Sequence, residues 1–243
     1  MNKKIALVIG GSGGIGSETA RTLSENGFMV LATYYTDKGY LADVKEKDGI
    51  KFYKMNLLDD KSTTSAFNSM YKDYGKIDVV IFSVTNQTKN KNMLDMQWKD
   101  FEDHINLQIK GMLHVIKSMK DYIKSKQKTK FVIVLTEYCA GKPPSGLSDY
   151  ITAKYALMGF AKSMGAELSK YNCTVNMVSP CMVDTKLISN LPPKLVEMTA
   201  ENNPLKRIAL PSDVAKVILF LSSEDSDYLN GVNILVNGGG VML

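Results

Sequence analysis

The feature that most constrains the fold is a short apolar strand followed at once by a cluster of glycines. Residues 5–9 read IALVI, an uninterrupted apolar run that is typical of a strand buried on both faces of a sheet. The next seven residues are Gly10-Gly11-Ser12-Gly13-Gly14-Ile15-Gly16, and a helical pattern covers residues 15–26. This order of strand, tight turn and helix predicts the beginning of a parallel sheet whose faces are covered by helices.

The same alternation continues to the end of the 243-residue chain. Six further strands are predicted, at residues 28–33, 52–55, 78–82, 131–135, 174–178 and 233–236. Helical patterns occupy residues 98–124, 150–170 and 211–221, the last with Asp213 in its first turn. Since no repeat, low-complexity tract or linker interrupts them, we expect one domain over residues 1–243. Its predicted fold is α/β, a doubly wound (Rossmann) parallel sheet of seven strands with helices on both faces.

Composition excludes several classes of protein. The 30 basic and 25 acidic residues give a net charge of +5 without a basic run, so we expect no nucleic-acid partner. Apolar runs such as residues 5–9 are too short to span a membrane, and we expect neither a membrane segment nor a signal peptide. The three cysteines and two histidines show no metal-ligand spacing, so we expect no metal site, no Ser-His-Asp triad, reduced thiols and a cytoplasmic location.

The glycine cluster is also a binding motif. Residues 11–16 match G-x-G-x-x-G in the strand–turn–helix context that a dinucleotide fingerprint requires. Glycines let the backbone approach a pyrophosphate, and the N-terminus of the helix offers N–H groups and a positive dipole end. We therefore expect a dinucleotide to contact Gly10, Ser12, Gly13, Gly14, Ile15 and Gly16.

The end of the second strand bears on the choice of dinucleotide. An acidic residue there would bind the ribose 2′-OH and favour NAD, but the position falls at about Tyr34, followed by Tyr35 and Thr36. Thr36 could donate a hydrogen bond to a 2′-phosphate, and Lys38 could add positive charge. This segment favours NADP(H) over NAD(H), although the nearby Asp37 keeps NAD(H) open.

Tyr150 and Lys154 are four residues apart in a helical pattern, and that spacing places them on one helix face. A free phenol has a pKa of about 10 and is a poor base at neutral pH. A nearby ammonium and a cationic nicotinamide favour the phenolate and lower this pKa. Such a tyrosine can exchange a proton with a carbonyl or alcohol oxygen while hydride moves at carbon.

With these motifs, the whole chain resembles the short-chain dehydrogenase/reductase family, and within it the 3-oxoacyl-[acyl-carrier-protein] reductases. The matching pieces are Gly10-x-x-x-Gly14-Ile15-Gly16, Asn56-Leu57, Tyr150-x-x-x-Lys154, Asn176-x-x-Ser179-Pro180, Asp184-Thr185, Pro211-Ser212-Asp213-Val214-Ala215 and Asn237-Gly238-Gly239. The resemblance implies that Tyr150 is the general acid/base and that Lys154 binds the nicotinamide ribose and lowers the tyrosine pKa. It also implies a homotetramer, a substrate lid at about residues 186–204, and cofactor contacts from Asn56, Leu57, Ser83, Pro180, Val183 and Thr185.

The chain departs from the family pattern beside the expected cofactor. The family's Asn-Asn-Ala-Gly after the fourth strand is replaced by Phe82-Ser83-Val84-Thr85, whose side chains are expected to weaken or reshape cofactor binding. The family's glycine after Pro180 is Cys181, which we interpret as a small buried filler.

Two catalytic positions are ambiguous. The family's serine falls on Thr136 when counted from the fifth strand and on Glu137 when counted back from Tyr150. We prefer Thr136, because its hydroxyl can donate to a substrate carbonyl whereas an ionised glutamate would repel the developing oxyanion. The family's helical asparagine falls on Asn106 or Gln108. We prefer Gln108 as the proton-relay residue, because the helical wheel places it in the apolar stripe.

Together these residues predict NADPH-dependent reduction of a carbonyl to a hydroxyl, with Tyr150 as general acid/base. The resemblance implies a 3-oxoacyl thioester or related ketone as the substrate, with an acyl carrier protein as an expected carrier. The apolar side of the lid suits such a substrate. Two alternatives stay open. One is an NAD(P)-dependent alcohol or sugar dehydrogenase, and the other is a catalytically impaired, cofactor-binding regulator.

Overall fold

Seven parallel strands form one sheet in the computed structural model, which describes residues 3–43 and 49–242. The strand order is β3-β2-β1-β4-β5-β6-β7, and every neighbouring pair is parallel. The strands are β1 (Ile5–Ile9), β2 (Met29–Tyr34), β3 (Ile50–Lys54), β4 (Val79–Phe82), β5 (Thr129–Val134), β6 (Cys173–Pro180) and β7 (Asn233–Val236). The predicted doubly wound α/β fold is confirmed.

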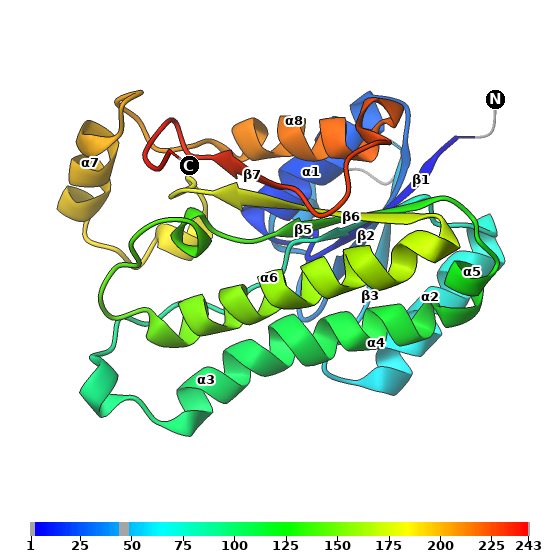
Figure 1. The fold of residues 1–243 in the computed structure, drawn as a ribbon, viewed down its shortest axis with the longest axis horizontal. Helices are drawn as coiled ribbons and strands as arrows, with labels where there is room; N and C mark the ends of the chain where they lie inside the picture. Colours follow the sequence, from blue (N-terminus) through cyan, green and yellow to red (C-terminus); the bar gives the residue numbers. More distant parts are fainter. Residues whose placement is uncertain (1–2, 44–48, 243) are drawn as a thin grey trace.

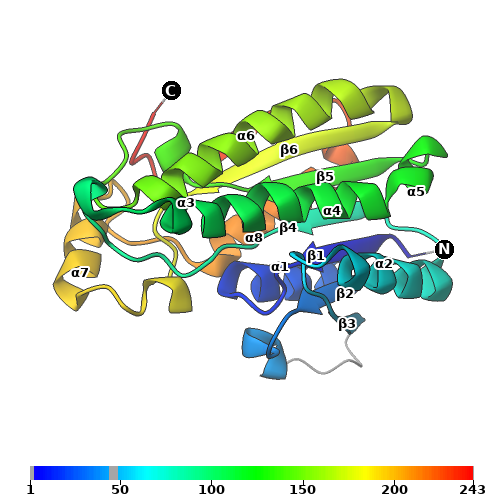
Figure 2. The same ribbon diagram turned by 90° about the horizontal axis from the view of Figure 1, so that it is seen from below.

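Helices cover both faces of this sheet, so the molecule has three layers (Figures 1 and 2). One face carries α2 (Asp60–Tyr74), α4 (Gly111–Ser118) and α6 (Ser148–Leu168). The other carries α1 (Gly14–Glu25) and α8 (Pro211–Ser222). Asp213 lies in the first turn of α8, as predicted, and its carboxylate accepts a hydrogen bond from the Leu210 N–H (2.8 Å).

The position of β1 inside the sheet, covered by helices on both faces, explains why residues 5–9 are all apolar. Leu7 and Ile9 pack in the core beneath α2, α4 and α6, whereas Ala6 and Val8 pack in the core beneath α1 and α8. All four side chains are fully buried. A strand covered on both faces reads as a continuous apolar run rather than as an alternating one.

The helical stretch predicted over residues 98–124 is helical in the structure, but it is divided into shorter segments. This segment forms α3 (Trp98–Ile105), a π-helical turn (Asn106–Lys110), α4, and then α5 (Lys120–Lys124) after a break at Met119. A π turn inserts one extra residue into a helix, and the apolar spacing on either side stays helical. The sequence pattern therefore hides the insertion.

Helix α2 has no counterpart among the helices predicted from the sequence. Asp59 caps its first turn by accepting a hydrogen bond from the Lys61 N–H (3.0 Å), and Gly75 ends it in the left-handed conformation (φ 71°). An aspartate and a glycine spaced in this way are ordinary start and stop signals for a helix, and they could have located α2.

None of the helices in the described part of the chain is long and apolar enough to cross a membrane.

Candidate active site

Two adjoining cavities lie at the carboxyl ends of the strands, where the strand order reverses between β1 and β4. The first, here the glycine cleft, is lined by Gly10, Ser12, Gly13, Gly14, Gly16, Tyr34, Asn56 and Leu57, among others. The second, here the tyrosine cavity, has a volume of about 670 Å³ and is lined by Thr136, Tyr150, Lys154, Pro180 and Val183, among others. Both cavities share Ile15, Ser83, Val84, Thr85, Thr185 and Leu187, so a long ligand can extend from one into the other.

The glycine cleft has the features of a diphosphate site. Gly10 has a φ of 86°, and a Cβ atom added there would lie 2.3 Å from the carbonyl oxygen of Ser83. A Cβ on Gly16 would lie 2.1 Å from the carbonyl oxygen of Gly10. No side chain caps the N-terminus of α1, whose N–H groups and positive dipole end can therefore serve an anion. These residues fit a dinucleotide in the cleft.

We expect Gly16→Ala to lower the affinity for a nicotinamide dinucleotide by at least about ten-fold, which corresponds to ~1.4 kcal/mol. The added Cβ would collide with backbone, so the turn and the start of α1 must move apart. Fluorescence titration measures the effect. Gly159→Ala on α6 is the matched control, because a Cβ there meets no atom within 4 Å. Equal affinities of Gly16→Ala and wild type would contradict the predicted role of this turn.

At the far end of the glycine cleft, Thr36 does not take the cofactor-facing position predicted for it. Tyr34 and Asp37 line the cleft, whereas Thr36 is not among its lining residues. The Thr36 hydroxyl donates instead to Asp37 Oδ2 (3.3 Å), and Asp37 Oδ1 accepts from the Gly39 N–H (2.8 Å). Lys38 Nζ lies 4.7 Å from the centre of the Phe52 ring. A carboxylate, and not the Thr36 hydroxyl, therefore lines this end of the cleft.

Helix α6 holds Tyr150 and Lys154 on one buried face of the tyrosine cavity. Lys154 Nζ donates to the carbonyl oxygen of Val134 (2.8 Å) and to Gln108 Oε1 (3.4 Å). It lies 5.9 Å from the centre of the Tyr150 ring. The lysine is thus anchored behind the tyrosine by the end of β5 and by the π-helical turn.

Burial controls the protonation of both groups. It raises the pKa of Tyr150, and the hydrogen bond with Thr136 opposes this only in part. Burial also lowers the pKa of Lys154 to about 8. That Lys154 lowers the tyrosine pKa stays a prediction, because the raised pKa of Tyr150 comes first from desolvation of its phenolate. At neutral pH both groups therefore carry their protons.

Thr136, rather than Glu137, faces Tyr150. Thr136 is buried in the cavity wall just after β5 and hydrogen-bonds with Tyr150. Glu137 is not among the lining residues of this cavity, and its side chain hydrogen-bonds with Asn237. Burial raises the pKa of Glu137.

Gln108 is buried in the middle of the π-helical turn and joins three elements. Its Nε2 donates to the carbonyl oxygen of Val84 (2.8 Å), just after β4, and its Oε1 accepts from Lys154 on α6. Asn106 is only half-buried and belongs to the lining of neither cavity. Gln108 also lines neither cavity, but its side chain hydrogen-bonds with Lys154 and so lies behind the Tyr150–Lys154 pair.

The replaced Asn-Asn-Ala-Gly segment forms the shared wall of the two cavities. Ser83, Val84 and Thr85 line both, and Val84 Cγ1 lies 2.9 Å from the position of a Cβ on Gly10. The side chain of Val84 therefore closes over the glycine turn. Cys181 lies at the other side of the tyrosine cavity, where burial raises the pKa of its thiol and keeps it protonated.

The segment at residues 186–204 contributes apolar side chains to the tyrosine cavity. It contains a short 3-10 turn (Lys186–Ile188) and α7 (Pro193–Asn202), and its lining residues are Leu187, Ile188, Asn190, Leu191, Pro192, Leu195 and Thr199. Two side-chain amides tie it to the loop after β4, from Gln87 Nε2 to the Leu187 carbonyl and from Asn190 Nδ2 to the Thr88 carbonyl (both 3.2 Å). Of the described residues that line the cavity, Lys154 alone is charged at neutral pH, so the space suits an uncharged, largely apolar ligand.

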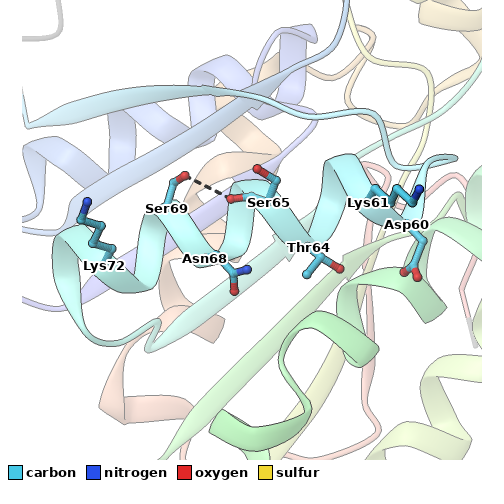
Figure 3. Close-up of a pocket in the computed structure, with 7 residues that line it drawn as sticks. All are labelled: Asp60, Lys61, Thr64, Ser65, Asn68, Ser69 and Lys72. Atoms are coloured by element: carbon cyan, nitrogen blue, oxygen red, sulfur yellow. Dashed lines mark hydrogen bonds between the residues drawn. The ribbon is translucent and has the colours of Figure 1, made fainter.

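A shallow polar depression on α2 is separate from these cavities (Figure 3). Its lining residues all come from that one helix, and the Ser69 hydroxyl donates back to the Ser65 carbonyl (3.1 Å). The opposite face of α2 packs into the core through Ala66, Phe67 and Met70. The depression is therefore the solvated side of an amphipathic helix.

Comparison with known proteins agrees with this geometry. A family described as "Enoyl-(Acyl carrier protein) reductase" matches residues 10–240. The chain is 30% identical to the 3-oxoacyl-[acyl-carrier-protein] reductase FabG of Buchnera aphidicola subsp. Baizongia pistaciae, over 99% of this chain and 98% of the relative. It is 31% identical to the protein of the same name from Aquifex aeolicus, over 97% of this chain and 96% of the relative.

Proposed function

We propose that this chain, an NAD(P)-dependent oxidoreductase that belongs to the short-chain dehydrogenase/reductase family, uses NADPH to reduce the carbonyl of a 3-oxoacyl thioester or related ketone. One observation carries the proposal. Tyr150, with Thr136 hydrogen-bonded beside it and Lys154 anchored behind it, stands where the glycine cleft opens into a largely apolar cavity whose one charged residue, among the described lining residues, is Lys154.

The chain's own residues account for the proton side of this reaction. NADPH, when bound in the glycine cleft, supplies the hydride to the carbonyl carbon. Thr136 and Tyr150 donate hydrogen bonds to the carbonyl oxygen, and Tyr150 releases its proton to that oxygen as negative charge develops there. The raised pKa of Tyr150 keeps the phenol protonated before the reaction, as an acid requires. Lys154 binds the nicotinamide ribose with Gln108 behind it, and its positive charge stabilises the phenolate that remains.

The relatives support a thioester substrate. Two proteins of similar length are named as reductases of 3-oxoacyl groups on acyl carrier protein. The apolar residues of the 186–204 segment suit an acyl chain, and we propose that this segment is the substrate lid. We further propose a cytoplasmic homotetramer, and a monomeric mass by light scattering would contradict the tetramer.

The choice of NADPH over NADH can be tested at Asp37. A carboxylate beside a 2′-phosphate is repulsive, and unit charges near a surface interact by about 1 kcal/mol. Asp37→Asn should therefore strengthen NADPH binding by about three- to five-fold and leave NADH binding unchanged. Fluorescence titration with both cofactors measures this. A variant that loses NADH affinity without gaining NADPH affinity would mean that Asp37 binds the ribose hydroxyls and that NADH is the cofactor.

Initial rates with four classes of substrate test the proposed reaction. An acetoacetyl thioester should oxidise NADPH, while alcohols and sugars with NADP⁺ should react far more slowly. A crotonyl thioester tests the second candidate, enoyl reduction, which the description of the matching family favours. We expect no enoyl reduction, since the relatives that match the whole chain are named as reductases of 3-oxoacyl groups. Reduction of the crotonyl thioester alone would overturn the proposal.

A further inference from the structure

We infer that His104 and Asp149 form a positioning pair, which ties the helix leading to Gln108 to the helix that carries Tyr150 and Lys154. The inference rests on the proposed function, because the pair acts on the residues of that reaction. It accounts for two buried polar groups that the mechanism above does not use. Both side chains are more than nine-tenths buried, although a buried polar group is costly unless it has partners.

The pair lies directly beside the reacting tyrosine. His104 is in the last turn of α3, and its Nε2 lies 3.6 Å from Asp149 Oδ2. Asp149 Oδ1 accepts a hydrogen bond from the Tyr150 backbone N–H (2.7 Å) in the first turn of α6. The rings of His104 and Tyr150 meet edge to face, with their centres 5.9 Å apart. Each member of the pair therefore contacts Tyr150, one through the backbone and one through the ring.

The surroundings define the protonation of the imidazole. Nδ1 of His104 is buried and has no hydrogen-bond partner among the described residues. A proton on Nδ1 would be an unpaired donor and would turn the Nε2 lone pair toward a carboxylate, so the proton belongs on Nε2. Burial lowers the pKa of His104, and the positive charge of Lys154 adds to this effect. The negative charges of Asp149 and Asp103 oppose it. The imidazole is therefore neutral at pH 7, with its Nε2–H dipole directed at Asp149.

The pair and Gln108 hold the same two helices together on either side of the reacting groups. Gln108 follows His104 by four residues, in the π-helical turn, and contacts Lys154 through Oε1. His104 contacts Asp149 immediately before Tyr150. These two links fix the distance from α3 to α6 at both Tyr150 and Lys154. Displacements of about 1 Å between reacting groups can cost about 10²-fold in rate, so a link at this place affects turnover more than binding.

Variants at His104 separate the polar link from simple packing. His104→Leu fills the space without a donor, whereas His104→Gln keeps an N–H that can reach Asp149. We expect His104→Leu to lower kcat about 10- to 100-fold, with KM for the thioester and Kd for NADPH within two-fold of wild type. His104→Gln should restore kcat to within about three-fold. Ile218→Val, in the core on the other face of the sheet, controls for a stability loss of about 1 kcal/mol and should keep wild-type kcat.

Two kinetic results would overturn the inference. One is a kcat of His104→Leu within two-fold of wild type, and the other is an equal loss in His104→Leu and His104→Gln. If wild type does not oxidise NADPH with any substrate, the proposed function fails, and the positioning role fails with it. The pair itself is tested without turnover by ¹H–¹⁵N correlation spectra of the two histidines, with His114→Gln to identify the signals. A neutral imidazole protonated on Nε2 at pH 7 supports the pair, and a proton on Nδ1 contradicts it.

Discussion

Replacing Tyr150 by phenylalanine is expected to lower kcat by about 10²–10⁴-fold, the usual contribution of a positioned acid or base. The ring, its packing and the backbone contact with Asp149 all remain, so the protein should fold and Kd for NADPH should stay within two-fold. What is lost is the hydroxyl that hydrogen-bonds with Thr136. In the proposed reaction, this hydroxyl gives its proton to the carbonyl oxygen. Rates of NADPH oxidation and fluorescence titration measure the two effects separately.

Tyr138→Phe is the matched control for this experiment. Tyr138 lines the same cavity and belongs to the short turn after Thr136, but it has no role in the proposed reaction. We expect its kcat within about three-fold of wild type. A Tyr150→Phe protein that keeps more than a tenth of the wild-type kcat would mean that another group supplies the proton.

Replacing Lys154 by methionine should produce a more stable but nearly inactive protein. Methionine removes the charge that, in the proposed reaction, binds the ribose and stabilises the phenolate, so kcat/KM should fall by at least about 10²-fold. The same charge destabilises the folded protein, because burial lowers the pKa of Lys154 from 10.5 to about 8. Methionine abolishes this penalty but leaves the Val134 carbonyl without its donor. The free energy of unfolding at pH 7 should therefore rise by about 1–2 kcal/mol.

The pH dependence of this gain has a definite sign. A lysine with a lowered folded pKa binds fewer protons in the folded than in the unfolded protein between pH 8 and 10.5. The free energy of unfolding of the wild type therefore rises with pH through that window. In Lys154→Met this contribution is absent, because methionine does not titrate. Denaturant unfolding at pH 7 and pH 10 should show the difference shrinking. Lys162→Met, at an exposed position on the same helix, is the matched control and should change neither activity nor stability. A Lys154→Met protein that is less stable than wild type at pH 7 would contradict the account.

The fold could be read from the sequence because its signals are local. The apolar run of β1, the glycine turn and the helical spacing of Tyr150 and Lys154 each lie within a few residues, and the structure shows the predicted strand, turn and helix. The position of Gln108 also followed from a helical wheel, although the turn that holds it is π-helical. In that case the apolar stripe on either side was enough to distinguish it from Asn106.

Features that depend on distant contacts were not accessible in this way. Nothing in the sequence near Tyr150 shows that its side chain is buried deeply enough to raise the pKa of the phenol. Thr36 and Asp37 are neighbours, and only the path of the chain after β2 decides which of them faces the cleft. The contact of His104 with Asp149 joins two helices that are far apart in the sequence. No periodic pattern of residues in the sequence indicates that these two side chains meet.

Transfer of deuterium from NADPH labelled at the nicotinamide C4 tests the central claim most directly. The purified protein is incubated with an acetoacetyl thioester and the labelled cofactor, and the product is analysed by mass spectrometry. We predict a 3-hydroxybutyryl thioester that carries one deuterium at C3 when the label is on one face of the ring, and none when it is on the other. Tight NADPH binding without transfer of deuterium to any carbonyl of the substrate panel would contradict the assignment of this chain as a carbonyl reductase.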